Sequence, residues 1–451
     1  MCGVVCLKII VALCSLLVWG SGQVINKQFI KGVIFFLVQA AFVIYEFTTG
    51  TWAVMTGQVE AQFRNAGFFS RGLWGLITLG EIPRERIDGA WVEVFDHSIM
   101  LMMSGLIALV FIVAYILLTI WSCRDAYKTR LKIEEGEIAD SKAYAKSLWA
   151  NSFEYIMITP GAILVIFISV LPVLFSALVA FTNYNTHNIP PASLVEWVGF
   201  STFSNLVRIP VWGTSFLRIL GWTVAWAFLA TGSAFTFGFL QAVLINTKGI
   251  RLKKVWRGIF ILPWAIPGMV SLLVFRVMFN REGVLNQLML DAGLIDSFIP
   301  WMSQTAWARL MLVLVNIWLG FPYFMALITG IMTTISPEYY EAVEIDGGGG
   351  LHKFRYITLP LVFTSIAPLL VMSLTHNFNN FGVVYFLTEG GPVSHTLQNA
   401  GYTDILITWL FSLTLDYRMF NFASVFSILI FMVLAVVSGF TLMRTRAFKE
   451  D

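Results

Sequence analysis

The sequence predicts an all-α membrane protein that crosses the bilayer many times. Of its 451 residues, 58% are hydrophobic and only 12% are charged, whereas a soluble domain usually has about a quarter charged residues. Apolar runs of about 18 residues or more recur along the chain, and each is long enough to cross a bilayer as a helix. Only helices and closed barrels satisfy the backbone in lipid, and these runs lack the alternation of barrel strands.

Nine apolar segments are candidate spans: 4–20, 29–47, 97–121, 155–182, 218–245, 256–279, 307–333, 357–383 and 420–443. The first is short and either crosses or lies in the interface, which gives eight or nine crossings. It also lacks the basic cluster that opens a secretory signal, so we expect a retained membrane segment. Prolines inside the spans predict kinks or hinges, at Pro160, Pro172, Pro263, Pro267, Pro322 and Pro368.

The distribution of basic residues predicts the orientation, because short cytoplasmic loops are rich in Lys and Arg. The loop 247–257 has no acidic residue and carries Lys248, Arg251, Lys253, Lys254 and Arg257. The tail also carries basic residues, namely Arg444, Arg446 and Lys449. Both should be cytoplasmic, so the C-terminus is expected inside. The loop 384–417 has no Lys or Arg and should face outward.

The spans fall into two blocks. Residues 1–121 form an N-terminal prefix of two or three spans with an outward loop at 48–96. Residues 122–152 form a cytoplasmic linker of mixed charge, 153–443 a six-span core, and 444–451 the tail. In the prefix we expect a cytoplasmic turn at 22–32, with Lys27 and Lys31 at the interface, and an amphipathic piece at 68–79 with Trp74 at the interface. Nothing in the linker favours nucleic-acid binding.

Several classes of chemistry are disfavoured. The sequence contains no G-x-x-x-x-G-K-[ST] and no H-E-x-x-H, and its five histidines and four cysteines have no ligand spacing. We therefore expect no catalytic residue, no metal site and no bound cofactor. An ion-driven carrier usually needs charges deep in its spans. The charges that come closest lie near span ends, where snorkelling or interfacial pairing explains them: Glu46, Glu154, Arg218 and Arg276.

A polar segment, 336–360, separates two candidate spans. Ser336 can cap a helix that starts at Pro337, and Asp346-Gly347 can end it. A helix of about nine residues is not stable alone in water and needs a surface to dock on. We expect a helical knob at one membrane face, then a hinge at 347–350, then re-entry at Ile357.

A second polar feature, T-H-N-F-N-N-F at 375–381, lies inside a candidate span. Asn377 and Asn380 are three residues apart, so a helix would place them on one face. Amides inside a bilayer serve either hydrogen bonds between helices or a ligand. Sugar hydroxyls form hydrogen bonds with amides, and pyranose rings stack on aromatic side chains. From these residues alone the two interpretations are equal.

Two groups of motifs resemble those of known families. The segment 341–360 resembles the EAA loop of ABC importer permeases, although Val343 and Gly348 replace the usual alanines. The segments 261–280, 316–325 and 377–392, with F-T-N-Y at 181–184 and W-V-G-F at 197–200, resemble maltose/maltodextrin-type (MalF-like) carbohydrate permeases. This second resemblance covers about two-thirds of the chain, residues 153–443. The prefix, with C-R-D-A-Y at 123–127, is similar to that of Gram-positive maltodextrin or galacto-oligosaccharide permeases.

The resemblance implies a six-span core of the MetI-like, type I importer fold and two sets of site residues. Residues that couple to the ATPase would be Glu338, Glu341, Ala342, Asp346, Gly347, Phe354 and Pro360. Residues that face the substrate would be Leu319, Gly320, Tyr323, Ser373, His376, Asn377 and Asn380. His376 stands where the family pattern leads us to expect an aromatic residue, so the sugar preference would differ.

The implied function is that of one permease subunit in a binding-protein-dependent importer of maltodextrin or related oligosaccharides, in the bacterial cytoplasmic membrane. The implied partners are a second permease (MalG-like), an ATPase dimer (MalK-like) that holds ATP and Mg²⁺, an extracytoplasmic sugar-binding protein, and lipid. The segment 183–215 is short and lacks a large insert, so the contacts with that binding protein would differ from those of relatives that have one. The outward segment 388–401 is another candidate contact. The alternatives are an ion-coupled sugar carrier and a membrane scaffold or sensor.

Overall fold

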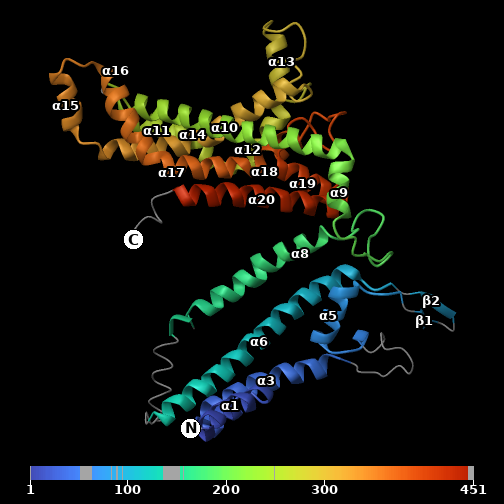
Figure 1. The fold of residues 1–451 in the computed structure, drawn as a ribbon. Helices are drawn as coiled ribbons and strands as arrows, with labels where there is room; N and C mark the ends of the chain where they lie inside the picture. The colour runs from blue at the N-terminus through green and yellow to red at the C-terminus, as the bar shows by residue number, and fades with distance from the viewer. Residues whose placement is uncertain are drawn as a thin grey trace. The chain divides into compact units, whose positions relative to one another are not determined.

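The computed structural model describes residues 2–50, 63–82, 84–87, 90–93, 95–135, 153–155, 157–247 and 249–444. The described residues are helical apart from loops and one short hairpin, β1 (Arg84–Ile87) with β2 (Ala90–Glu93) (Figure 1). The predicted all-α class is therefore confirmed. The chain divides into two compact units, residues 1–202 with 419–451, and residues 203–418.

Six described helices are long and apolar enough to cross a membrane. The number rises to seven if the bent pair of helices Lys253–Ala265 and Gly268–Met278 is counted as one span. In the first unit these are α3 (Phe29–Thr49), α6 (Ser98–Glu134) and the helix Phe153–Val179, which contains the π-turn η1 (Ile166–Val170) and α8 (Leu171–Val179). The last predicted span corresponds to α20 (Phe420–Arg444). The predicted linker begins as a continuation of α6, and the rest of the linker lies outside the described residues. Three of the basic residues used to predict the orientation, Lys248, Arg446 and Lys449, also lie outside them.

The first apolar segment forms a helix that is shorter than the six candidate spans. α1 (Cys2–Leu17) and α3 both run along α6 toward its N-terminal end. Lys8 pairs with Glu134 (2.8 Å), and Trp19, just beyond α1, lies 4.6 Å from Tyr115 between ring centroids. α3 follows the same course, because its first turn meets Asp125 and Phe42 reaches Phe111. The chain must return between the two helices, and α2 (Ser21–Ile25) is this return.

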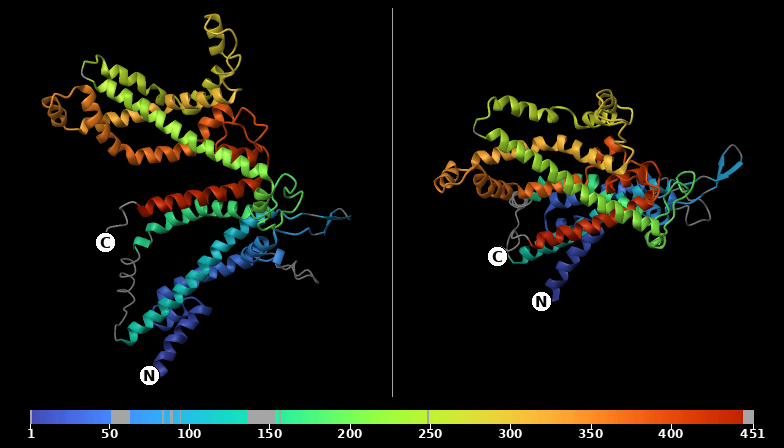
Figure 2. Two further views of the ribbon diagram at one scale, coloured as in Figure 1. Left: turned by 45° about the horizontal axis from the view of Figure 1, so that its top comes forward. Right: turned by 90° about the horizontal axis from the view of Figure 1, so that it is seen from above.

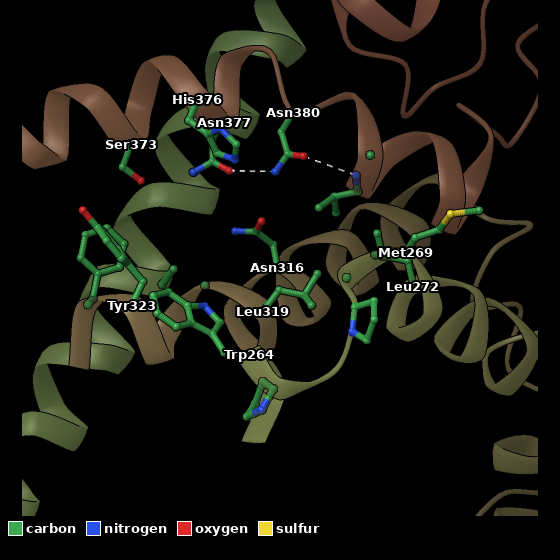
Figure 3. A pocket seen from close by; sticks show the side chains of 18 of the residues that line it. Trp264, Met269, Leu272, Asn316, Leu319, Tyr323, Ser373, His376, Asn377 and Asn380 are labelled. Carbon is green, nitrogen blue, oxygen red and sulfur yellow. Dashed lines mark hydrogen bonds between the residues drawn. The ribbon is translucent and has the colours of Figure 1, made fainter. Parts of the chain in front are cut away.

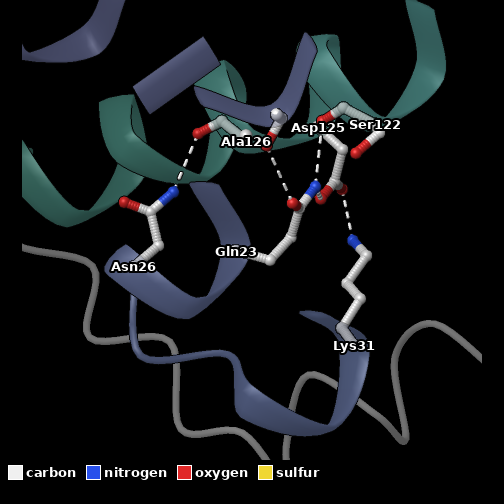
Figure 4. Close-up of polar contacts among 7 residues, drawn as sticks. Gln23, Asn26, Lys31, Ser122, Asp125 and Ala126 are labelled. Carbon is white, nitrogen blue, oxygen red and sulfur yellow. Dashed lines mark hydrogen bonds and ion pairs between the residues drawn. The ribbon is translucent and has the colours of Figure 1, made fainter. Parts of the chain in front are cut away.

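The segment 22–32 contains the turn between α2 and α3, as predicted, and this turn packs against α6. Gln23 and Asn26 are buried and donate hydrogen bonds to the backbone carbonyls of Ser122 and Ala126 (both 2.9 Å) (Figure 4). Lys31 forms an ion pair with Asp125. The physical reason is that α2 folds back onto α6, whose carbonyls give the buried side-chain amides of Gln23 and Asn26 hydrogen-bond partners.

The amphipathic piece forms a helix as predicted, α5 (Phe68–Thr78), and Trp74 on it is buried. Its close partner is α6, where the Cβ of a side chain at Gly72 would come within 2.6 Å of Ala108 Cβ. Of the two roles expected for Glu46, snorkelling or pairing, the structure shows pairing. Its carboxylate accepts the N–H groups of Phe69 (2.7 Å) and Ser70 (3.1 Å), which satisfies the N-terminus of α5.

The second unit is built on α10 (Pro210–Asn246) and α14 (Thr305–Thr334), which pack side by side (Figures 1 and 2). Gly238 allows this approach, because a Cβ there would lie 2.7 Å from Phe321 O. The unit also contains α9 (Ser201–Arg208), α11 (Lys253–Ala265), α12 (Gly268–Met278), α13 (Val284–Asp291), α15 (Pro337–Ile345), α16 (Gly350–Lys353), η2 (Phe354–Thr358), α17 (Leu359–Phe378), α18 (Phe381–Thr388) and α19 (Leu406–Leu415).

Two predicted spans are broken. The segment 256–279 forms α11 and α12, which meet at an angle of 87°. Ile266 precedes Pro267 and has extended backbone angles, as residues before proline prefer. The segment 357–383 is helical only to Phe378, and Asn380 caps a new helix, α18. Both breaks lie beside the cavity described next.

Candidate functional site

A cavity of about 740 Å³ lies within the second unit, between α10, α14, α17 and the two broken spans (Figure 3). All seven residues predicted to face a substrate line it: Leu319, Gly320, Tyr323, Ser373, His376, Asn377 and Asn380. Three come from α14 and three from the end of α17, and the seventh caps α18. The structure therefore brings together two groups of residues that lie at least 50 positions apart in the sequence.

The helix break places the two asparagines. Asn377 ends α17, where its side chain donates to Thr231 Oγ1 (3.0 Å) and its carbonyl accepts the Trp226 indole N–H (3.0 Å). Asn380 donates to Asn377 Oδ1 (3.2 Å), and its own Oδ1 accepts the N–H of Val383 (3.4 Å) (Figure 3). The expectation that both amides lie together is confirmed, but the continuous helical face assumed for it is wrong.

Each of these amides keeps hydrogen-bonding capacity. A carboxamide offers two N–H donors and two lone pairs on oxygen. Asn377 uses one N–H and one lone pair within the chain, and Asn380 does the same. The interhelical role is thus present, and one donor and one acceptor per amide remain for a ligand. The third asparagine of the motif, Asn379, is exposed and does not line the cavity.

Trp264 and Asn316 are among the lining residues that were not predicted from the sequence. The Trp264 ring lies 6.0 Å from that of Tyr323, between centroids, and the two rings are tilted by 33°. The bend between α11 and α12 is what places this tryptophan at the cavity. Asn316 is buried and donates to the carbonyl of Ala230 (3.2 Å). A polar amide inside an apolar run was the available signal for Asn316.

The cavity wall is neutral, since its lining includes no Asp, Glu, Lys or Arg. Amides, a serine hydroxyl and a tyrosine provide directed hydrogen bonds, and Trp264 with Tyr323 provides aromatic faces. Gly320 has a packing reason as well, because a Cβ there would lie 3.1 Å from Ala234 Cβ. Such a wall suits an uncharged, polyhydroxylated ligand with flat apolar faces.

The predicted knob is present as α15, nine residues long (Figure 1). Ser336 Oγ accepts the N–H of Glu338 (3.4 Å), Pro337 occupies the first turn and Gly347 has φ +77°, as predicted. The re-entering helix begins earlier than expected, at Gly350, and runs unbroken to Phe378. The expected hinge at 347–350 therefore shortens, because its last glycine is already helical.

Among the predicted coupling residues, Glu338, Glu341, Ala342, Asp346 and Gly347 are exposed on α15 or just after it. Pro360 is exposed near the start of α17. Phe354 differs, because its half-buried ring packs against Phe239 (5.5 Å between centroids) inside the unit. It anchors the base of the segment instead of facing outward.

Comparisons with known proteins identify relatives over nearly the whole length. The family described as "Binding-protein-dependent transport system inner membrane component" matches residues 234–445. The chain is 35% identical to the galactooligosaccharides transport system permease protein GanP of Bacillus subtilis, over 98% of this chain and 99% of that protein. It is 32% identical to the maltodextrin transport system permease protein MdxF of the same organism, over 96% and 94%.

The maltose/maltodextrin permease MalF of Escherichia coli is 32% identical over 60% of this chain and 53% of that protein. Two solved structures share the fold. A bacterial ABC transporter that imports the acidic polysaccharide alginate has a TM-score of 0.53 and 21% identity, over 68% of this chain and 100% of that one. The alginate transporter in complex with a periplasmic protein bound to alginate pentasaccharide has a TM-score of 0.51 and 23% identity, over 65% and 94%.

Proposed function

The chain belongs to the inner-membrane components of binding-protein-dependent transport systems, the permease subunits of ABC importers, and we propose that its substrate is an oligosaccharide of the maltodextrin or galacto-oligosaccharide class. Family membership makes it a multi-pass inner-membrane transport subunit and not an enzyme. The predicted resemblance to carbohydrate permeases is thereby confirmed. The names of the relatives with nearly full coverage support the substrate class.

One observation carries the proposal for the substrate site. The seven residues expected to face a sugar, from two separate segments, line one neutral cavity with spare amide donors and acceptors and two aromatic rings. In this proposal Asn377 and Asn380 bind hydroxyls, Tyr323 and Trp264 stack on or hydrogen-bond to sugar rings, and Gly320 lets a ring approach the backbone. The site binds and orients the sugar, and no bond of the sugar is made or broken.

The coupling role is proposed for α15 and the turn that follows it. Its exposed surface would dock on an ATPase subunit, and that partner would hold ATP and Mg²⁺. A second permease chain would complete the pathway, and an extracytoplasmic binding protein would deliver the sugar. α15 and the C-terminus would then be cytoplasmic. ATP binding drives the change because the partners have different affinities for the inward- and outward-facing states.

The test is to purify the tagged chain from its native membrane and identify the proteins that accompany it. A P-loop ATPase, a second permease and a solute-binding protein are the expected companions, and ATP-dependent uptake of maltodextrin or galacto-oligosaccharide should follow on reconstitution with them. Recovery of the chain alone, with uptake in vesicles that follows an ion gradient and ignores ATP, would instead establish the ion-coupled carrier.

A further inference from the structure

A second cavity, of about 550 Å³, shares no lining residue with the first. It lies within the same unit, between the N-terminal part of α10, the first turns of α14 and the loop 397–404. α15 follows the opposite end of α14 (Figure 1). The second cavity, which we call the outer cavity, is therefore at the end of the unit where the loop 384–417 is predicted to face outward.

The outer cavity is preformed. The Arg309 guanidinium lies 3.9 Å above the centroid of the Trp222 ring, and it donates through Nε (3.1 Å) and Nη2 (2.8 Å) to the carbonyl of Tyr402. The Trp222 indole N–H donates to the carbonyl of Thr403 (3.1 Å). These contacts join α14, α10 and the loop into one wall, so little ordering would be needed when a ligand binds.

The charges in this cavity are unbalanced. Arg218 and Arg309 both line it, and neither forms an ion pair within the described part of the chain. Arg218 is exposed and has one long hydrogen bond, to Thr396 Oγ1 (3.4 Å). Among the described residues, Asp404 is the one carboxylate that lines the cavity, and it is buried and accepts the Gly401 N–H and the Thr408 hydroxyl (both 2.7 Å). Two guanidinium groups thus keep N–H donors that point to no acidic partner.

We infer that the outer cavity binds a carboxylate, and that an acidic side chain of the extracytoplasmic binding protein supplies it when that protein docks. Guanidinium groups match carboxylates by charge and by the geometry of paired N–H donors. The binding protein as the partner rests on the proposed function. A volume of about 550 Å³ accommodates a side chain together with part of the loop that presents it.

Position along α14 favours a delivering protein over a membrane lipid. Arg309 and Asn316 are seven residues apart on one face of this helix, so the two cavities are about 10 Å apart along its axis. A protein seated at Arg309 would hold its sugar above the first cavity. A phospholipid headgroup would instead belong at the perimeter of the bundle, away from the axis that joins the two cavities.

The experiment uses the complete importer, reconstituted with its binding protein in nanodiscs of neutral lipid and again in nanodiscs rich in phosphatidylglycerol. The measured quantities are the Kd of the binding protein and the ATPase stimulation it causes. Arg218→Gln and Arg309→Gln should each raise that Kd about tenfold in both lipids, with the effect shrinking at high salt. Arg281→Gln is the matched control, because Arg281 is exposed on the loop before α13 and does not line the outer cavity.

The outcomes separate the explanations. Variants whose Kd equals that of the control would overturn the inference, as would an effect confined to phosphatidylglycerol, which would assign the cavity to lipid. Because Arg309 also fixes the loop, the exposed Arg218 decides the result if Arg309→Gln fails to assemble. An unaltered chain that binds no solute-binding protein would refute the proposed function, and this is seen before any variant is made.

Discussion

Replacing Asn377 by alanine removes the acceptor for Asn380 Nδ2 (3.2 Å) and two further functions of the side chain, which the structure allows to be separated. The first is the hydrogen bond to Thr231 Oγ1, which joins α17 to α10. Such a bond between membrane helices contributes about 0.6–2 kcal/mol to stability. The second is the proposed bond to a sugar hydroxyl, for which about 0.5–1.5 kcal/mol is expected. That range corresponds to an increase of about 2- to 12-fold in the half-saturating sugar concentration.

Thr231→Val is the matched control. Thr231 is buried and does not line the cavity, so valine removes the bond between the helices and leaves the sugar contact in place. Both variants should therefore lower the melting temperature of the purified subunit, and Asn377→Ala should lower it more, because it also removes the hydrogen bond from Asn380. Only Asn377→Ala should also raise the half-saturating concentration for oligosaccharide.

The assay is uptake of labelled oligosaccharide into proteoliposomes that contain the full importer, at matched amounts of inserted subunit. A complete titration is needed, because the proposed change lies in the concentration dependence. Equal half-saturating concentrations for Asn377→Ala and Thr231→Val would refute the reasoning. Asn377 would then serve the packing of α17 on α10 and nothing more.

Three further predictions use other parts of the second unit. Gly347→Arg places a long side chain at a residue with φ +77° in the proposed ATPase contact, so it should reduce sugar-coupled ATP hydrolysis while insertion is normal. Gly349→Ala is the control and should be tolerated, because φ at Gly349 is −82°. Normal uptake by Gly347→Arg would contradict this prediction. Trp264→Ala should raise the half-saturating concentration about fivefold through lost stacking, whereas Trp256→Ala, outside the cavity, should not. Burial raises the pKa of Asp404 to about 6. The folded subunit therefore holds this proton more tightly than the unfolded chain does. The free energy of unfolding should fall by about 3 kcal/mol as pH rises from about 4 to about 6 and then level off. Melting temperatures of Asp404→Asn should lack this component, and an unchanged pH profile would show that the carboxyl ionises normally.

Local rules predicted some of these features well. The limits of α15 follow from Ser336, Pro337 and Gly347, because capping and left-handed termination depend on residues within one turn. The membrane class follows from composition and from the lengths of the apolar runs. The seven residues of the first cavity came from the resemblance of two motifs, since periodicity alone left the asparagines equally suited to packing.

The features that were not predicted from the sequence depend on tertiary contacts. The buried turn of α2 could not be foreseen, because Gln23 and Asn26 are satisfied by carbonyls of α6 about 100 residues away. The break after Phe378 depends on Trp226 and Thr231, which hold Asn377 from another helix. The bend at Ile266 was signalled by Pro267, but its angle and the resulting place of Trp264 were not. The spacing of three residues correctly predicted that Asn377 and Asn380 lie together, but they meet across a helix break and not on one continuous helix.

The same contacts indicate how force applied at α15 would reach the sugar cavity. A run of glycines would transmit little force, yet α15 does not depend on it. Tyr340 OH shares a hydrogen bond with the buried Thr358 Oγ1 (3.2 Å), and Glu344 pairs with Lys353, so two contacts bridge the turn. Beyond them one unbroken helix runs from Gly350 to Phe378. We therefore expect a displacement of α15 to be transmitted along this helix, which contains η2 and Pro368, to the break beside Asn377, where the amides would meet the sugar.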